Sequence, residues 1–239
     1  MSLQPAKITS ANIPVHERIE LMRQTVKMVA EAVTPAAIIT GPGGIGKTHE
    51  VLAALAELGL NKNEDYHFVK GYSSARGLFE ALFSNNGTLT VFDDCDSALN
   101  DRTAIELLKG ALDSYSTRTI SWLVKAQKLS PAIPDTFEFD GRIIFISNMQ
   151  LERLNLPLRS RCLIIDLKMT REEILARIRE ILPAIKGFSA KEKALAYGFV
   201  LEWSSYIRNL NLRTIQMVLK IIRAHPVDWQ KLASYTVTQ

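Results

Sequence analysis

The sequence predicts an α/β protein in which a three-layer domain with a parallel sheet is followed by a small subdomain made only of helices. Short apolar runs of strand length alternate with helical patterns up to Asp166. A glycine-rich loop at residues 41–46 joins one of these runs to a helix. Beyond Asp166 only helical patterns continue. Strands separated by helices indicate a parallel sheet that is covered on both faces. We therefore expect the α/β domain at residues 1–167 and the helical subdomain at residues 168–239.

The helices and strands of the first domain are predicted from the spacing of apolar residues. A helix is expected at residues 19–33, where apolar residues recur every three or four positions. A second helix follows Thr48 and ends near Gly59, with its apolar residues again on one face. Five apolar runs are typical of buried strands. They are residues 36–39, 68–69, 89–92, 143–146 and 163–165.

Two capping boxes mark helix starts in the C-terminal part. Thr170 with Glu173, and Ser189 with Glu192, each place a hydroxyl before a helix and a carboxylate three residues later. In this arrangement each side chain can bond the other residue's backbone N–H. A further helical face is formed by Leu212, Ile215, Val218 and Ile222.

Composition and charge narrow the range of functions. The chain has 239 residues, 47% of them hydrophobic, and a net charge of +4, which is compatible with nucleic-acid binding but too small to argue for it alone. Cys95 and Cys162 lie far apart, and the four histidines lack ligand spacing, so neither a disulfide nor a zinc site is expected. No stretch has the length of a membrane span and no signal-peptide pattern is present. We therefore expect a cytoplasmic protein with no membrane partner.

The glycine-rich loop fits the phosphate-binding pattern G-x-x-x-x-G-K-[ST]. Glycines let backbone N–H groups turn toward phosphates, and the N-terminus of the following helix adds partial positive charge. The lysine should reach the β- and γ-phosphates, and the threonine hydroxyl should ligate Mg²⁺. A strand before the loop and an amphipathic helix after it are the context that the pattern requires, so ATP and Mg²⁺ are the expected ligands. The predicted nucleotide-binding residues are Gly41, Pro42, Gly43, Gly44, Ile45, Gly46, Lys47, Thr48 and the adjacent His49.

An acid pair follows the apolar run at residues 89–92 and resembles a Walker B element. Asp93 would hold Mg²⁺ through water, together with Thr48, and Asp94 would orient or deprotonate the attacking water. The second acid is usually Glu in fast ATPases of this kind, and Asp is one methylene shorter. Slow turnover, or help from Asp96, therefore stays open.

Three further segments resemble elements of AAA+ ATPases, in the order and spacing of that family. The resemblance covers residues 13–225 and implies the P-loop fold with a helical lid. The strand at 143–146, which ends in Asn148, resembles the sensor 1 element. Residues 157–162 resemble the arginine-finger segment, and their Ser-Arg-Cys triplet has the form typical of clamp-loader subunits. Residues 211–213 begin a helix where the family has sensor 2.

The resemblance implies a role for each of these residues. Asn148 would polarise the attacking water or contact the γ-phosphate. Arg161 would reach the γ-phosphate of a neighbouring subunit, with Arg159 as the alternative finger. Arg213 would contact the phosphates of its own subunit. A finger that acts on a neighbour implies a homo-oligomer in the form of a ring or spiral.

Residues 117–141 depart from the minimal fold. Residues 118–124 and 136–139 have strand patterns and are joined by a basic, turn-like segment. A hairpin just before the sensor 1 strand resembles the insertion of helicase-type AAA+ proteins, which points into the pore of the ring. Lys125 and Lys128 could then follow a DNA phosphate backbone. A sheet-edge extension with solvated lysines is the alternative.

The function that these features favour is that of an oligomeric Mg-ATP-dependent ATPase in DNA replication, recombination or repair, of clamp-loader, helicase or helicase-loader type. DNA and a replication or recombination protein would be its partners. An ATPase that remodels proteins, and an ATP-binding switch with slow turnover, remain alternatives. A small-molecule kinase would not need Arg161 and Arg213 in these places. Little chain remains after residue 225 for a clamp-loader collar, and the short chain suggests a phage or mobile-element protein in a bacterial cytoplasm.

Overall fold

The computed structural model describes residues 13–123 and 132–239. The chain divides into two compact units. The first comprises the residues up to 167 without 43–46, and the second comprises residues 168–239 together with 43–46. Among the described residues, no helix is both long and apolar enough to cross a bilayer.

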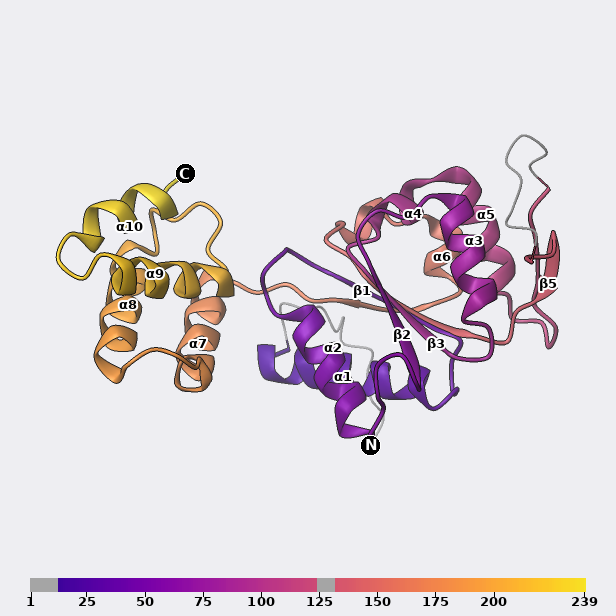
Figure 1. Cartoon of the computed structure of the whole chain (residues 1–239), viewed down its shortest axis with the longest axis horizontal. Helices are drawn as coiled ribbons and strands as arrows, with labels where there is room; N and C mark the ends of the chain where they lie inside the picture. The colour runs from indigo at the N-terminus through magenta and orange to yellow at the C-terminus, as the bar shows by residue number, and fades with distance from the viewer. Residues whose placement is uncertain (1–12, 124–131) are drawn as a thin grey trace, which may run out of the picture. The chain divides into compact units, whose positions relative to one another are not determined.

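A five-stranded sheet forms the centre of the first unit (Figure 1). Every neighbouring pair of its strands is parallel. Two strands, β1 and β3, are buried along their whole length, which explains why most of their residues are apolar. The strands in spatial order are β2 (Tyr66–Lys70), β3 (Leu89–Asp93), β6 (Arg142–Ile146), β1 (Ala36–Thr40) and β7 (Leu163–Asp166).

Helices cover both faces of this sheet, as the sequence predicts (Figure 1). One face carries α1 (Val15–Ala30) and α2 (Lys47–Glu57). The other carries α3 (Ala75–Ser84), α4 (Asp96–Asn100), α5 (Arg102–Ala111) and α6 (Leu156–Arg159), and a short 3-10 turn (Leu151–Arg153) precedes α6. The three-layer α/β architecture is thereby confirmed. Because all five strands run in the same direction, their carboxyl ends meet at one edge, where open parallel sheets bind ligands.

The expected hairpin is present in the first unit. β4 (Thr119–Ser121) pairs antiparallel with β5 (Thr136–Glu138). Its apolar side chains are buried, and the Phe137 ring lies edge-on to that of Phe79 in α3, with centroids 5.1 Å apart. The hairpin therefore packs on the helical layer beside the sheet. Lys125 and Lys128, the predicted DNA contacts, fall at residues 124–131 and lie outside the described residues.

Four α-helices and one 3-10 turn build the second unit. They are α7 (Arg171–Ile181), the turn (Leu182–Ala184), α8 (Ala190–Trp203), α9 (Leu212–Ala224) and α10 (Trp229–Val237). Both predicted capping boxes are confirmed, at Thr170 and at Ser189. A hydrophobic core of its own holds the unit together, with Ile178, Val200 and Val218 among its buried residues. No strand occurs in the described part of this unit, as expected.

Candidate active site

The loop after β1 has the backbone that phosphate binding requires. Gly41, Gly44 and Gly46 have φ values of 137°, 78° and 96°. Residues with a side chain rarely adopt these values, so glycine is needed at these positions. Ile45 is buried and anchors the loop. The loop leads directly into α2, whose first residue is Lys47. Its N–H groups and the start of α2 can therefore face an anion together.

Lys47 is buried, and its ammonium group is already held in place. Nζ donates to the carbonyl oxygens of Gly41 at 2.7 Å and Pro42 at 2.8 Å. It also donates to Oδ1 of Asn148 at 3.0 Å. Asn148 follows β6, the strand next to β1. The predicted sensor 1 amide and the loop lysine are therefore in direct contact.

Asp93 ends β3 and is almost fully buried, at 1% exposure. Its Oδ1 accepts a hydrogen bond from the Thr48 hydroxyl at 2.9 Å. A carboxylate and a hydroxyl oxygen at this separation are hard oxygen donors of the kind that Mg²⁺ prefers. The two residues predicted to hold the metal thus lie together, and their chemistry fits Mg²⁺.

Asp94 turns the chain at the end of β3. Its φ of 55° lies in the left-handed region, and its N–H donates to the Ile146 carbonyl at 3.0 Å. Its Oδ1 accepts from Nδ2 of Asn148 at 2.7 Å, and the side chain is about 39% exposed. Asn148 therefore joins the two residues, because its amide nitrogen donates to Asp94 and its amide oxygen accepts from Lys47.

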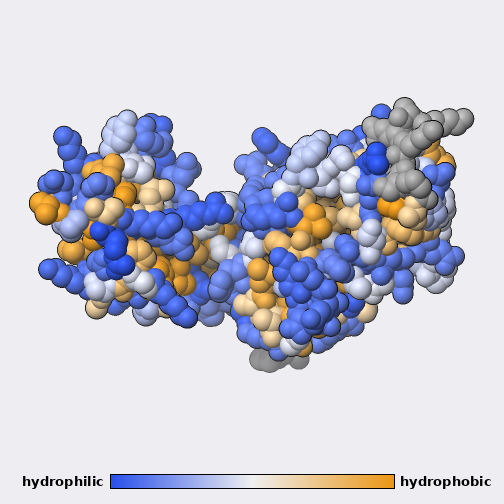
Figure 2. Space-filling model, viewed as in Figure 1, coloured by the Kyte–Doolittle hydropathy of each residue, from blue (hydrophilic) through white to orange (hydrophobic). Residues whose placement is uncertain are grey.

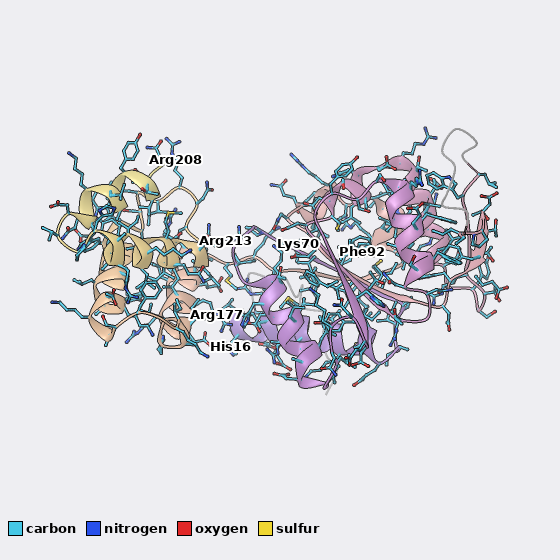
Figure 3. The ribbon with its side chains drawn as sticks, viewed as in Figure 1. His16, Lys70, Phe92, Arg177, Arg208 and Arg213 are labelled. Atoms are coloured by element: carbon cyan, nitrogen blue, oxygen red, sulfur yellow. The ribbon has the colours of Figure 1, made fainter. Side chains whose placement is uncertain are left out.

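Lys70, at the end of β2, belongs to the same group but was not predicted from the sequence (Figure 3). Its Nζ donates to Oδ2 of Asp93 at 2.8 Å and lies 3.7 Å from Oδ2 of Asp94. The hydrogen bond to Asp93 raises the pKa of Lys70. The signal in the sequence is a basic residue at the end of a strand. That signal gains meaning only when β2 is known to lie beside β3.

These side chains form one connected network at the carboxyl edge of four neighbouring strands. Each side chain in the network contacts the next, beginning at the lysine that follows the glycine-rich loop and ending at the threonine after it. Its members are Lys47, Asn148, Asp94, Lys70, Asp93 and Thr48. The network joins two lysines and two aspartates with a neutral amide and a hydroxyl group. Bound phosphates could interact with the lysines, and a bound metal ion with the aspartates.

Two other predicted residues stand apart from the network. Asp96 begins α4, and its buried Oδ1 has no hydrogen-bond partner among the described residues. His49 is highly exposed on α2, with Nδ1 3.6 Å from Oε1 of Glu50. Within the part of the chain that the structure describes, neither side chain forms a hydrogen bond or an ion pair with a member of the network.

Both candidate finger arginines lie along a cavity of about 1010 Å³ in the first unit. Arg161 donates Nη1 to the Pro157 carbonyl at 3.1 Å, and its Nε is buried with no partner among the described residues. Arg159 ends α6, and its guanidinium group has no hydrogen bond or ion pair within the same set. The third predicted arginine, Arg213, is exposed in the first turn of α9 (Figure 3).

The two cysteines have the character of buried structural residues. Burial and the charge of Asp93 raise the pKa of Cys95 to about 11. Burial raises the pKa of Cys162 to about 12. Both thiols are therefore protonated at neutral pH and are poor nucleophiles. The described residues contain no cluster of His, Cys, Asp and Glu that could hold a metal ion without other donors.

Fold and site together define the class. The chain has the α/β P-loop fold of AAA+ ATPases, with a parallel sheet and a helical C-terminal part. No protein-family model matches the sequence. The sequence is 28% identical to an uncharacterised 36.7 kDa protein from the nrdC-mobD intergenic region of Enterobacteria phage T4, over 92% of this chain and 73% of that protein.

Solved structures share the fold at low sequence identity. A RuvB mutant of Thermotoga maritima matches with a TM-score of 0.56 and 17% identity, over 96% of this chain and 70% of RuvB. NtrX of Brucella abortus, in complex with ADP, matches with a TM-score of 0.53 and 19% identity, over 88% of this chain and 51% of NtrX. At such identities the likeness establishes the fold alone.

Proposed function

We propose that the protein is an oligomeric Mg-ATP-dependent ATPase of the AAA+ family that acts on DNA in replication, recombination or repair. The observation that carries the ATPase part is the link from Lys47 through Asn148 to Asp94. One amide touches both the lysine that would bind the γ-phosphate and the acid that would act on the attacking water. Such an arrangement would bring the attacking water and the γ-phosphate to the two sides of one side chain.

The binding of ATP is assigned to the loop and Lys47. Backbone N–H groups of residues 43–46 would surround the β-phosphate, and Lys47 would exchange its carbonyl partners for phosphate oxygens. Thr48 and Asp93 would hold Mg²⁺, which when bound draws negative charge from the β- and γ-phosphates. Lys70, on the other oxygen of Asp93, would hold this buried carboxylate in place through its hydrogen bond.

Hydrolysis is assigned to Asp94 as the general base, assisted by an amide that positions the water and by arginines that contact the nucleotide. Asp94 would accept a proton from the attacking water as the water oxygen bonds to the γ-phosphorus and the bond to the β-bridging oxygen breaks. Asn148 would hold that water in line. Arg161, or Arg159 in its place, would stabilise the transferring phosphoryl group in a neighbouring subunit, and Arg213 would contact the nucleotide of its own subunit.

Two observations support DNA as the substrate. A hairpin stands immediately before β6 in the position of the insertion of helicase-type relatives. The structural likeness to RuvB extends over 96% of the chain. A slow ATP-binding switch is the second candidate, because Asp94 is short and is held by Asn148 through its Oδ1.

The first experiment separates binding from turnover. Lys47→Ala should abolish tight ATP binding in calorimetry, because it removes the cation that reaches the terminal phosphates. Lys62→Ala, which removes an exposed lysine before β2, is the matched control and should bind as the wild type does. Undiminished ATP affinity of Lys47→Ala would overturn the site. ATPase rates with and without single- or double-stranded DNA then test the substrate, and a slow rate that DNA does not change would favour the switch.

A further inference from the structure

The charge of the chain is divided unevenly along the sequence. Residues 168–239 contain 12 Lys and Arg against 6 Asp and Glu, a net charge of +6 with His neutral. Residues 1–167 contain 17 against 19, a net charge of −2. The net charge of +4 for the whole chain is therefore the sum of a strongly basic helical subdomain and a slightly acidic α/β domain. A local excess of this kind is an electrostatic footprint for a polyanion.

A two-point ion pair fixes the place where part of this charge gathers. Arg223, in the last turn of α9, donates Nε and Nη2 to Oε1 and Oε2 of Glu192 at 2.7 and 2.8 Å. Glu192 lies in the first turn of α8. The Arg223 guanidinium also lies over the Phe188 ring, 4.7 Å from its centroid. Two independent contacts thus hold the end of α9 against the start of α8.

Several cations lie near this contact along the chain. We call this group the α8/α9 basic patch, and it consists of Lys186, Lys191, Lys193, Lys220 and Arg223. Its lysines lie within one helical turn of Glu192 or Arg223, or two residues before Phe188. Within the described residues, Glu192 is the one carboxylate that pairs with a member. The other four charges of the patch are therefore uncompensated there.

The lysines of the patch are available to a ligand. Lys186, Lys191 and Lys220 are exposed, and their ammonium groups have no hydrogen bond or ion pair in the described part of the chain. Lys193 donates to the Pro183 carbonyl at 2.8 Å. The capping box at Ser189 fixes the backbone at the start of α8. Four of the five charges extend from α8 and α9, and Lys186 lies in the turn before α8, so binding an anion would order few backbone groups.

The patch lies at the far end of α9 from Arg213. The helix has 13 residues, which is roughly 20 Å at about 1.5 Å per residue. Arg213 is in the first turn and Arg223 in the last, and α9 contains no acidic residue. A nucleotide-binding role for Arg213 would thus leave the patch free for a second anion.

We propose that the α8/α9 basic patch binds the phosphate backbone of DNA. The inference rests on the proposed function, since it names the surface by which the ATPase would hold DNA. Point charges on two helices and on the turn before α8 suit regularly spaced phosphates. An anionic membrane would require large apolar side chains that enter the lipid beside the lysines. Phe188, the aromatic residue of this region, is half-buried beneath Arg223 instead, and the visible surface of Figure 2 mixes hydrophilic and hydrophobic residues over the helical unit.

The test measures the affinity of the full chain for a fluorescent DNA duplex over a range of KCl concentrations. Lys191→Gln with Lys220→Gln removes two unpaired cations and leaves the Glu192–Arg223 pair intact. The slope of log K against log[KCl] should fall in magnitude by about 1.8, at about 0.9 for each lost phosphate contact. Affinity at low salt should fall on the order of 10-fold. Lys62→Gln with Lys231→Gln removes the same charge from exposed sites elsewhere and should leave the slope unchanged.

Each outcome decides the inference. An unchanged slope in the patch variant, with DNA bound by the wild type, would overturn the patch and leave the proposed function standing. A wild type that hydrolyses ATP but binds no DNA would overturn the patch together with the DNA part of the proposal. The patch would also be overturned if the variant lost binding to phosphatidylserine vesicles and kept its DNA affinity. Thermal melts and basal ATPase rates equal to those of the wild type exclude a folding defect.

Discussion

Lys70 supplies a positive charge to two carboxylates, one of them almost fully buried. Lys70→Met removes the ammonium and keeps the length of the side chain. Without nucleotide we expect a loss of about 1 kcal/mol in unfolding free energy, because Asp93 loses a charge-assisted hydrogen bond. Saturating Mg-ADP should narrow the difference from the wild type, since a metal ion on Asp93 would replace the lost charge.

Thermal melts with and without Mg-ADP measure this effect. Lys70→Arg keeps the charge and serves as the control, with a smaller loss expected in the metal-free protein. An equal deficit of Lys70→Met in both conditions would mean that Lys70 acts independently of the proposed metal site.

Asp94 can be tested by changing its chemistry and keeping its shape. Asp94→Asn retains an oxygen that accepts the Asn148 hydrogen bond, but it cannot take a proton. ATP affinity should be preserved, while kcat should fall roughly 10²- to 10⁴-fold. Asp96→Asn is the control, because Asp96 lies outside the network, and its turnover should stay near that of the wild type. If the two variants behave in the opposite way, Asp96 is the base.

At the scale of helices, Glu192 connects α8 to α9. Its carboxylate accepts from Arg223 and from the N–H and hydroxyl of Ser189, and these contacts lower its pKa from 4.5 to about 2. The lowered pKa means that the ionised form stabilises the fold. This contribution is fully present above about pH 4.5 and is lost as the pH falls through about 2.

Glu192→Gln should therefore lower the melting temperature at pH 7, and the gap from the wild type should narrow as the pH is lowered from 5 toward 3. Circular dichroism melts across that range provide the measurement. Glu202→Gln removes an exposed carboxylate on the same helix and is the control, with little change expected at any pH. A gap that stays constant with pH would show that the charge of Glu192 does not stabilise the pair of helices.

The elements that could be predicted are those with an uninterrupted or strictly periodic pattern. β1 and β3 are buried throughout, so each reads as a continuous apolar run. Only residues 68–69 of β2 were predicted, because Tyr66 is its sole fully buried residue and Lys70 is polar. The buried residues of α10, Trp229, Ala233 and Val237, recur every four positions. α10 escaped prediction because the exposed Leu232 and Tyr235 lie among them, so its apolar residues are not confined to one face.

The candidate site divides in the same way. Lys47, Thr48 and the acid pair follow from local motifs, whereas the contact of Lys70 depends on β2 lying beside β3. Strand neighbours are set by packing between distant segments, and a local sequence pattern does not specify them. Roles that resemblance alone implies, such as those of Arg161 and Arg213, remain predictions.

At the scale of the whole molecule, a finger in trans makes activity a property of the assembly. Specific ATPase activity should rise with protein concentration as subunits associate. Arg161→Ala should reduce turnover on the order of 10³-fold, because the finger stabilises charge in the transition state. ATP binding to the isolated subunit should survive, since the loop is intact.

Mixing Arg161→Ala with Lys47→Ala supplies the decisive comparison. Some interfaces would then combine an intact loop with an intact Arg161, so part of the activity should return. Arg159→Ala in the same assays decides which arginine is the finger. Full activity of Arg161→Ala in a preparation that light scattering shows to be monomeric would contradict the hypothesis that Arg161 acts in trans.

The left-handed backbone at Asp94 bears on how such a chain can evolve. Asp and Asn are among the few residues other than glycine that adopt this conformation readily. Exchange to Asn therefore meets little resistance from folding, although it removes the proton acceptor. Substitution by Glu would place a longer side chain at a backbone conformation that Glu disfavours. Substitutions at this position therefore more readily give a folded protein that binds ATP without hydrolysing it. They less readily give an enzyme with faster turnover.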